Sequence, residues 1–267
     1  MTEFPGKNIR AFRTKPEGAG FKMVDEHVAH HGLMTTGINF GPDGALYLAD
    51  WGNNGWAPHE KGRIMKLDSP RAIDRPLRIQ TRKLLGDGFA MGDDTELSRL
   101  LAHADQRVRL ESQFELVKRN ASNALLTVAK ENDSQLARIH AIWGIGQLGR
   151  KEQDAIIPLR PLLNDRDPEI QAQLLRVISD AYHNDFSEEA TDLLSSPHPR
   201  VQLFAGLALG KIGSAKNVPV ITDFLEANNN EDVFLRHAGV VALARAAEES
   251  PRSVLLLTRH PSESVRL

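Results

Sequence analysis

Apolar and polar residues alternate along the first part of the chain but recur with a helical spacing from residue 93 onward. Residues 9–13 and 21–25 alternate with a period of two, as strands do when one face is buried. Residues 63–67 repeat this alternation after a loop rich in glycine and asparagine. The pattern therefore predicts a sheet region followed by a helical region, which makes an α+β multidomain chain.

The most strongly patterned short segment, residues 37–51, predicts a β-hairpin. Ile38 and Phe40 alternate with small or polar neighbours, and leucines alternate again after the Gly-Pro-Asp-Gly sequence of residues 41–44. A single hairpin is marginally stable in water, so it needs neighbouring strands. The short strands on both sides supply them, and together they suggest an antiparallel sheet of the kind that forms propeller blades.

The helical region is built from repeats of one apolar stripe, with a period of roughly 30 residues. Its members are spaced at i, i+3, i+4, i+7, i+8 and i+11, which is one face of a helix. The clearest copies comprise Ala137, His140, Ala141, Gly144, Ile145 and Leu148; Val201, Phe204, Ala205, Ala208, Leu209 and Ile212; and Leu235, Ala238, Gly239, Ala242, Leu243 and Ala246. Ile170, Leu174, Val177, Ile178 and Ala181 form another copy, and Val108 and Leu116 anchor a more polar first one.

Capping residues, prolines and glycines between the periodic segments predict where helices and domains begin and end. Asp-Pro at 167–168 and Ser-Pro at 196–197 resemble helix starts, while Gly149 and Gly213 are expected to close helices in a left-handed conformation. Pro70 and Pro76 are expected to break regular structure, and with the glycines up to residue 92 they indicate a linker. We therefore expect a sheet region at 1–70, a linker at 71–92 and a helical solenoid at 93–267.

Composition narrows the chemistry. A formal net charge of −2 argues against a general nucleic-acid binder, which needs a basic surface. The absence of cysteine excludes thiolate catalysis, cysteine-ligated zinc and thioether-linked haem in this chain. No apolar run approaches membrane-spanning length, and no metal site is expected.

Residues 9–67, above all 37–51 and 61–64, resemble the last part of the β-propeller in bacterial glucose/sorbosone-dehydrogenase-like proteins. The repeats resemble HEAT repeats, which follow a secreted or periplasmic propeller in the large members of that family, often ahead of a cytochrome c domain. Propellers of the NHL type share the turn-strand pattern of the hairpin, and the helical sequel favours the first family. The resemblance implies about one blade of a partial propeller followed by an α-α superhelix, with pyrroloquinoline quinone and haem in the parent protein and no cofactor in this chain.

Both ends of the chain suggest a piece of a larger protein. About one blade cannot close a propeller. Residues 256–267 have the sequence pattern of the turn between the two helices of a repeat, but the second helix of that repeat is not part of the sequence. A solenoid normally ends in a polar capping helix. We therefore expect an internal fragment that is not catalytic by itself.

The residues that follow the hairpin are the best candidates for a binding site. Asp50, Trp51, Asn53 and Asn54 combine a carboxylate, a stacking surface and amides where propeller loops can reach a central site. The competing interpretation is structural, with Trp51 and Trp56 sealing a blade edge. No catalytic residue is assigned.

Other polar residues have two interpretations each. His27, His30 and His31 could ligate a metal or exchange protons, but solvent-exposed loop histidines are the simpler interpretation, because their order is not that of zinc hydrolases. Asp43 is expected to be a turn residue, because Asp-Gly sequences are common in β-hairpin turns. No catalytic residue is assigned to any of them.

Two groups of residues in the helical region can also be explained by a purely structural role. His140 and Trp143 lie on an apolar stripe and are expected to pack in the core. Arg236, His237 and Arg245 could belong to a concave binding face, although a solvated face explains them equally well.

Two functions remain from the sequence. In the first, the repeats form a scaffold that binds a protein partner or a neighbouring domain. In the second, the chain is the junction of a secreted quinone-dependent sugar or alcohol dehydrogenase, which passes electrons to a cytochrome c domain outside this chain. Flanking sequence would distinguish them.

Overall fold

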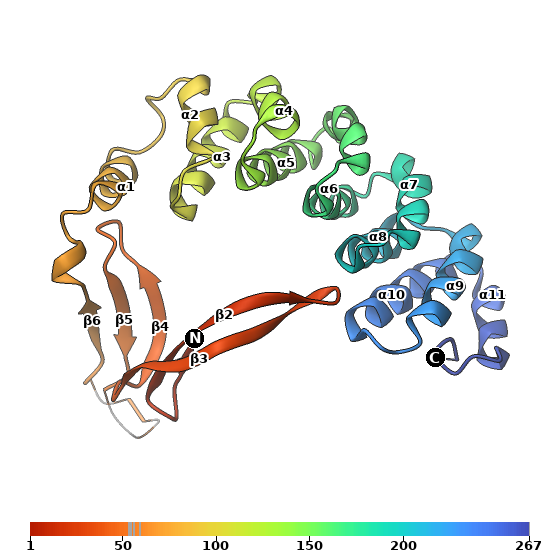
Figure 1. The fold of residues 1–267 in the computed structure, drawn as a ribbon, viewed down its shortest axis with the longest axis horizontal. Helices are drawn as coiled ribbons and strands as arrows, with labels where there is room; N and C mark the ends of the chain where they lie inside the picture. Colours follow the sequence, from red (N-terminus) through yellow and green to blue (C-terminus); the bar gives the residue numbers. More distant parts are fainter. Residues whose placement is uncertain (53–54, 56, 59, 267) are drawn as a thin grey trace. The chain divides into compact units, whose positions relative to one another are not determined.

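The computed structural model describes residues 1–52, 55, 57–58 and 60–266. It divides into two compact units. The first, here called the sheet unit, comprises Met1–Pro16 and Phe21–Met91. The second, the repeat unit, comprises Glu17–Gly20 and Gly92–Leu267. Figure 1 shows the strands in red and orange and the repeats from yellow to blue.

The strands form two three-stranded sheets. One has the order β1-β2-β3, from β1 (Thr2–Glu3), β2 (Asn8–Glu17) and β3 (Gly20–His31), and the other has the order β4-β5-β6, from β4 (Thr35–Phe40), β5 (Leu46–Asp50) and β6 (Arg63–Leu67). A propeller blade is a four-stranded sheet, and each of these sheets has three strands among the described residues, so the expected propeller blade is not confirmed. Strand β3 continues through His31, where a loop was expected.

The predicted hairpin is present as β4 and β5. Their register pairs Ile38 with Leu48 and Phe40 with Leu46, and the turn closes through hydrogen bonds from Gly41 N to Ala45 O and from Gly44 N to Gly41 O. Residues that face each other across antiparallel strands lie on the same side of the sheet. This side carries the small apolar core of the sheet unit, in which Leu48 packs with Ile9 and Leu33.

The expected linker contains a regular helix, α1 (Pro76–Asp87). Proline is favourable at the first position of a helix, because its fixed φ suits the helix and its missing N–H would have no partner there. Pro76 therefore begins this helix, whereas the sequence analysis treats it as a breaker. A short 3₁₀ turn, η1 (Pro70–Ala72), precedes it.

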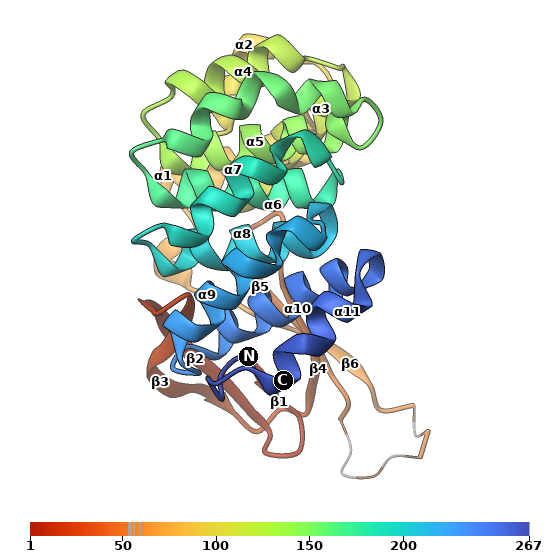
Figure 2. The same ribbon diagram turned by 90° about the vertical axis from the view of Figure 1, so that its right-hand side faces the viewer.

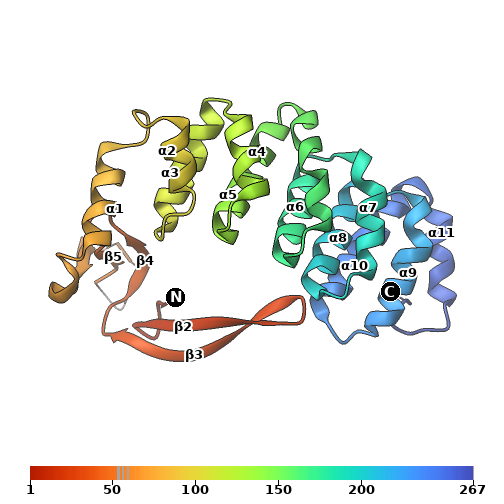
Figure 3. The ribbon, with the colours of Figure 1, turned by 45° about the horizontal axis from the view of Figure 1, so that its top comes forward.

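The repeat unit consists of helices packed in two rows. The inner row contains α3 (Gln106–Lys118), α5 (Gln135–Gly149), α6 (Pro168–Asp180), α8 (Pro199–Ile212) and α10 (Val233–Glu249). The outer row contains α2 (Asp94–Leu100), α4 (Ser122–Glu131), the 3₁₀ helix η2 (Gln153–Asn164), α7 (Ser187–Asp192), α9 (Val218–Asn228) and α11 (Pro251–Leu255). Short 3₁₀ turns η3 (Asn184–Phe186), η4 (Leu193–Ser195), η5 (Ala215–Asn217) and η6 (Leu256–Arg259) complete it. Figures 2 and 3 show these helices stacked pair upon pair.

The predicted apolar stripes are the core of the repeat unit. Every stripe residue named above is buried except Phe204, which is half-buried. Glycines on the inner helices let neighbours approach closely. A Cβ at Gly206 would lie 2.8 Å from the Cβ of Ala238, and one at Gly146 would lie 2.7 Å from Val177 Cγ1. The stacked solenoid architecture is therefore confirmed.

The predicted helix starts are correct in part. Asp93 and Asp167 cap α2 and α6 through their side chains. Ser196 does not cap α8, which begins at Pro199.

Neither of the two helix-closing glycines is left-handed. Gly149 lies inside α5, and Gly213 has a φ of −75°. Both positions instead lack room, because a Cβ would lie 2.6 Å from Ile156 Cδ1 at Gly149 and 2.4 Å from Leu209 O at Gly213.

Candidate functional site

Asp50 and Trp51, the described members of the predicted loop site, are both engaged in internal contacts. Asp50 is 4% exposed, and its carboxylate accepts hydrogen bonds from the backbone N–H groups of Met34 and Gly52 and from Arg63 Nε. Burial opposes ionisation of Asp50, but the bonds from Arg63, Gly52 and Met34 outweigh it and hold its pKa below the usual range. The indole of Trp51 donates to Gly55 O at 2.7 Å.

These bonds favour a structural role for both residues. The carboxylate oxygens of Asp50 are occupied by bonds that stabilise the strand ends, and a cofactor role of this loop stays a prediction. Asn53, Asn54 and Trp56 lie outside the described residues.

The three neighbouring histidines of β3 do not come together. His27 Nδ1 bonds to Asp25 O at 3.0 Å, and His31 Nδ1 bonds to Asn8 Oδ1 at 2.8 Å. Among the residues that the structure describes, no three His, Cys, Asp or Glu side chains form a group that could hold a metal ion.

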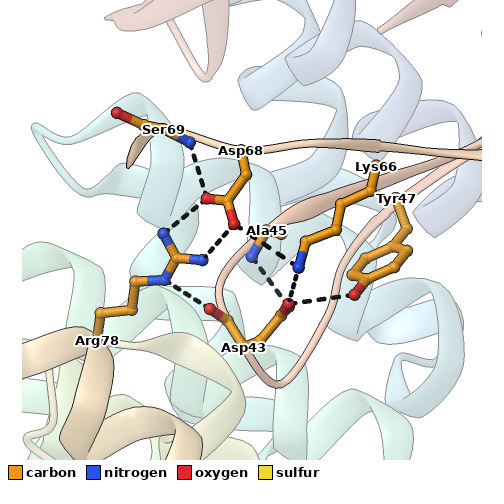
Figure 4. Close-up of polar contacts among 7 residues, drawn as sticks. All are labelled: Asp43, Ala45, Tyr47, Lys66, Asp68, Ser69 and Arg78. Carbon is orange, nitrogen blue, oxygen red and sulfur yellow. Dashed lines mark hydrogen bonds and ion pairs between the residues drawn. The ribbon is translucent and has the colours of Figure 1, made fainter. Parts of the chain in front are cut away.

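Asp43 is the centre of a polar cluster that the sequence analysis assigns only to the turn (Figure 4). Its carboxylate accepts from Ala45 N, Tyr47 Oη and Lys66 Nζ, the last at 2.7 Å. Its carbonyl accepts from Arg78 of α1. Arg78 in turn makes two bonds to Asp68, at 2.7 and 2.9 Å.

This cluster fastens α1 to the turn between β4 and β5. The hydrogen bond from Lys66, supported by Ala45 and Tyr47 against partial burial, lowers the pKa of Asp43 to about 2. Gly44 has a φ of +75°, and a Cβ there would lie 3.0 Å from Arg78 Nε. Because the charges are mutually paired, we interpret the cluster as structural.

The inner row of the repeat unit holds a groove of about 220 Å³ between α3, α5 and α6. We call it the inner groove. Its main lining residues are Phe114 of α3, Trp143 and Gln147 of α5, Arg150 directly after α5, and Arg176 and Asp180 of α6. Phe114 is 46% exposed and Trp143 is half-buried, so both present aromatic surface to the groove.

A line of side-chain hydrogen bonds crosses the inner helices and orients Trp143. Its indole Nε1 donates to Gln173 Oε1 at 2.9 Å, and Gln173 Nε2 donates to Glu169 Oε1 at 2.6 Å. Arg200 of α8 extends the line to Glu169 at 3.0 Å. Trp143 also packs edge-on against His140, with ring centroids 5.1 Å apart. The aromatic wall of the groove is thereby fixed in orientation.

His140 completes this line towards α3 from the core. Its Nδ1 lies 2.8 Å from Gln113 Oε1. Burial and, to a lesser degree, the positive charge of Arg109 lower the pKa of His140 to about 4. The expected core position of His140 is confirmed, and its ring is neutral near pH 7.

The inner groove carries more positively charged than negatively charged side chains. Asp180 is shared by Lys211 at 3.2 Å and Arg150 at 3.9 Å. Arg176 is exposed and lies over the Trp143 ring, 5.9 Å from its centroid. Within the described part of the chain, no carboxylate oxygen lies within 4.0 Å of the Arg176 side-chain nitrogens. Cations therefore outnumber carboxylates here.

The apolar stripes alone do not reveal this groove, although the positions beside them carry a signal for it. Trp143 and Arg176 each lie two residues before a central stripe residue, Ile145 and Ile178. Phe114 has the same place relative to Leu116. Corresponding positions of successive repeats lie side by side in a solenoid, so aligning the repeats and reading the positions beside the stripe would have brought these residues together.

The polar residues of α10 are not brought into this groove. Arg236 donates to Asn230 Oδ1 at 3.0 Å, and Arg245 pairs with Glu248. Arg236 and His237 are exposed. Their proposed place on a concave binding face stays a prediction.

Comparisons with known proteins identify the repeats. Residues 158–244 match the family model of HEAT repeats. A designed armadillo repeat protein shares 16% identity over 65% of this chain and 95% of its own, with a TM-score of 0.42. An engineered protein from the Northeast Structural Genomics Consortium shares 17% identity over 66% of this chain and 93% of its own, with a TM-score of 0.40. No curated protein matches the chain.

Residues 158–244 are thus similar to HEAT repeats, and the chain as described is a mostly helical repeat solenoid with two small antiparallel sheets. Across the described residues, no helix has both the length and the apolar character needed to cross a membrane.

Proposed function

We propose that the repeat unit is a protein-binding scaffold that engages its partner through the inner groove. The observation that carries this proposal is the aromatic pair Phe114 and Trp143, which present ring surface to a groove on the inner helices. Aromatic and arginine side chains dominate the energetics of protein interfaces. The groove places both types within a single small site.

Two further features support a binding role. The bond from Trp143 to Gln173 fixes the aromatic wall before a partner arrives, which reduces the entropy that binding costs. The volume of about 220 Å³ is smaller than the roughly 300–1,000 Å³ of sites that enclose small molecules. A side chain of a protein partner fits that size better than a cofactor does.

Selection from a random library of displayed peptides tests the proposal on the full chain. We expect enriched peptides to bind the wild type, and Phe114→Ser to weaken their binding by about tenfold or more, since a buried aromatic contact contributes at least 1.4 kcal/mol. Phe114 is 46% exposed, so this variant is expected to fold, which circular dichroism checks.

Ile157→Ser is the matched control, because Ile157 is 39% exposed on η2 in the outer row. It should leave peptide binding unchanged. Equal binding by the wild type and Phe114→Ser, or equal losses in both variants, would remove the inner groove as the binding site.

The dehydrogenase alternative is a second proposal, in which the rest of a propeller covers exposed apolar residues of β4. Ile38 and Phe40 are 39% and 59% exposed on the same side of the sheet as Leu48, and the faces of propeller blades pack against neighbouring blades. A parent propeller would cover them. We expect the chain itself to show no dye-linked sugar oxidation with added pyrroloquinoline quinone and calcium, and turnover in that assay would favour the enzyme over the scaffold.

A further inference from the structure

We propose that the inner groove binds a linear acidic peptide segment, with one large apolar side chain in the groove and flanking carboxylates on its arginines. This inference rests on the proposed function and adds the chemistry of the partner. It follows from three properties of the groove: its size, its apolar wall and its charge.

The volume of the inner groove and its aromatic wall favour the binding of one large apolar side chain of the peptide. Phe114 and Trp143 come from neighbouring helices and leave about 220 Å³ between α3, α5 and α6. An aromatic or leucine side chain placed there would contact both rings and displace water from them. Because Gln173 holds the Trp143 indole, the wall does not have to reorganise.

The charge selects acidic neighbours for that side chain. Arg176 lies over the Trp143 ring, and no ion pair to it is found among the described residues. Guanidinium groups bind carboxylates through two parallel hydrogen bonds, and stacking on an aromatic ring leaves the edge of the guanidinium available for them. Arg176 is therefore the primary carboxylate-binding residue of the groove.

Arg150, which follows α5 and lines the groove, reinforces this preference, and Lys211 of α8 competes with it for Asp180. Both lie near Asp180, at 3.9 and 3.2 Å, so the single carboxylate is shared between two cations. A basic peptide would meet the two arginines that line the groove, Arg150 and Arg176, whereas an acidic peptide would be attracted to both. Nucleic acid is disfavoured, because binding it needs a longer series of phosphate contacts than this groove supplies.

The test repeats the peptide selection on the full-length wild type, on Arg176→Glu and on Lys130→Glu. Lys130 is exposed on α4 of the outer row, so it controls for the reversal of one charge. We expect the wild type and Lys130→Glu to select the same peptides, with Asp or Glu on either side of Phe, Leu or Trp. Arg176→Glu should bind those peptides about tenfold or more weakly and should itself select lysine-containing or arginine-containing peptides.

Synthetic peptides separate the two contributions. Fluorescence polarisation of an enriched peptide should weaken about tenfold when its acidic residues become glutamine, and also when its apolar residue becomes serine. Neutral or basic peptides from the wild type, or equal binding by Arg176→Glu and Lys130→Glu, would overturn the acidic preference. The scaffold function would still stand in that case if Phe114→Ser weakened binding, and it would fail with the inference if Phe114→Ser did not.

Discussion

His140 shows how a residue that the sequence assigns to the core also supports the surface beside it. The ring is 2% exposed and contacts both Gln113 and Trp143. Burial lowers its pKa to about 4, so the folded state favours the neutral ring. An unfolded chain binds a proton at this residue below its ordinary pKa of 6.5, so protonation favours the unfolded state.

The stability of the repeat unit should therefore fall as the pH drops from about 6.5 to about 4. His140 contributes its full stabilisation above 6.5 and none of it below the folded pKa. With ~1.4 kcal/mol for each pKa unit, this residue accounts for a loss of up to about 3 kcal/mol. Urea unfolding of the wild type at pH 7 and pH 4.5 measures it.

His140→Gln removes the titrating group but keeps a polar partner for Gln113. We expect the loss of unfolding free energy between the two pH values to be clearly smaller in this variant than in the wild type. Identical pH dependence in both proteins would show that the buried ring is protonated as readily in the folded state as in the unfolded state.

The sequence predicted the burial of His140 but missed the exposure of Trp143. A stripe fixes which side of a helix faces the core, and His140 lies in the middle of it. Trp143 lies at its margin, where the curvature of the repeats and the hydrogen bond to Gln173 decide how much of the ring is exposed. The sequence likewise leaves Asp50 as a candidate binding residue, because its internal hydrogen bonds to Met34, Gly52 and Arg63 depend on the folded structure.

Among the elements, the inner helices were the most predictable and the connecting elements the least. Stripe spacing is a local property, so α5, α6, α8 and α10 follow directly from it. In contrast, α1 is held by bonds from Arg78 to Asp68, 10 residues earlier, and to Asp43, 35 residues earlier, and the spacing of apolar residues within α1 does not reveal them. The outer element η2 is a 3₁₀ helix with Pro158 and Pro161 inside it, which remove two of the backbone N–H donors.

Packing between neighbouring inner helices predicts a large cost for truncation in α8. Leu209 is fully buried in a row that packs against α6 and α10. Leu209→Ala should lower the unfolding free energy by roughly 2–5 kcal/mol, through lost apolar burial and the cavity that remains. Urea unfolding followed by far-ultraviolet circular dichroism measures the change.

Leu255→Ala is its control, because Leu255 is 66% exposed on α11. The same chemical change should shift the unfolding free energy by no more than about 0.5 kcal/mol there. A small effect at Leu209 would contradict the stripe assignment, whereas a large effect at Leu255 would indicate that this exposed surface is covered in solution.

On the scale of the whole molecule, the sequence predicted a change from strands to helices but not the arrangement of the strands. Local alternation gives each strand, whereas sheet closure depends on how many strands join and in which order. The observed order, β1-β2-β3 beside a separate β4-β5-β6 sheet, uses a long β2–β3 hairpin, although Pro16, Gly18 and Gly20 are typical of a chain breaker at residues 16–20. Strand β2 extends through Pro16 and Glu17 of that breaker, which leaves only a short turn before β3.

The two units also differ in the size of their apolar cores, and this difference predicts unequal stability. The core cluster of the sheet unit consists of Ile9, Leu33 and Leu48 with partly buried neighbours, while most of the fully buried large side chains belong to the repeat unit. Because stability scales with buried apolar surface, the sheets should open at a lower free energy than the inner helices do.

Hydrogen–deuterium exchange followed by mass spectrometry reports both units within one protein. We expect backbone amides of β5 (Leu46–Asp50) to exchange about tenfold or more faster, relative to their intrinsic rates, than those of α6 (Pro168–Asp180). Asp43→Asn provides a directional check, because it removes the charged partner of Lys66 at the β4–β5 turn. It should accelerate exchange in β5 and leave α6 unchanged. Equal protection in both elements, or a response of α6 to Asp43→Asn, would instead indicate that the chain unfolds as one cooperative unit.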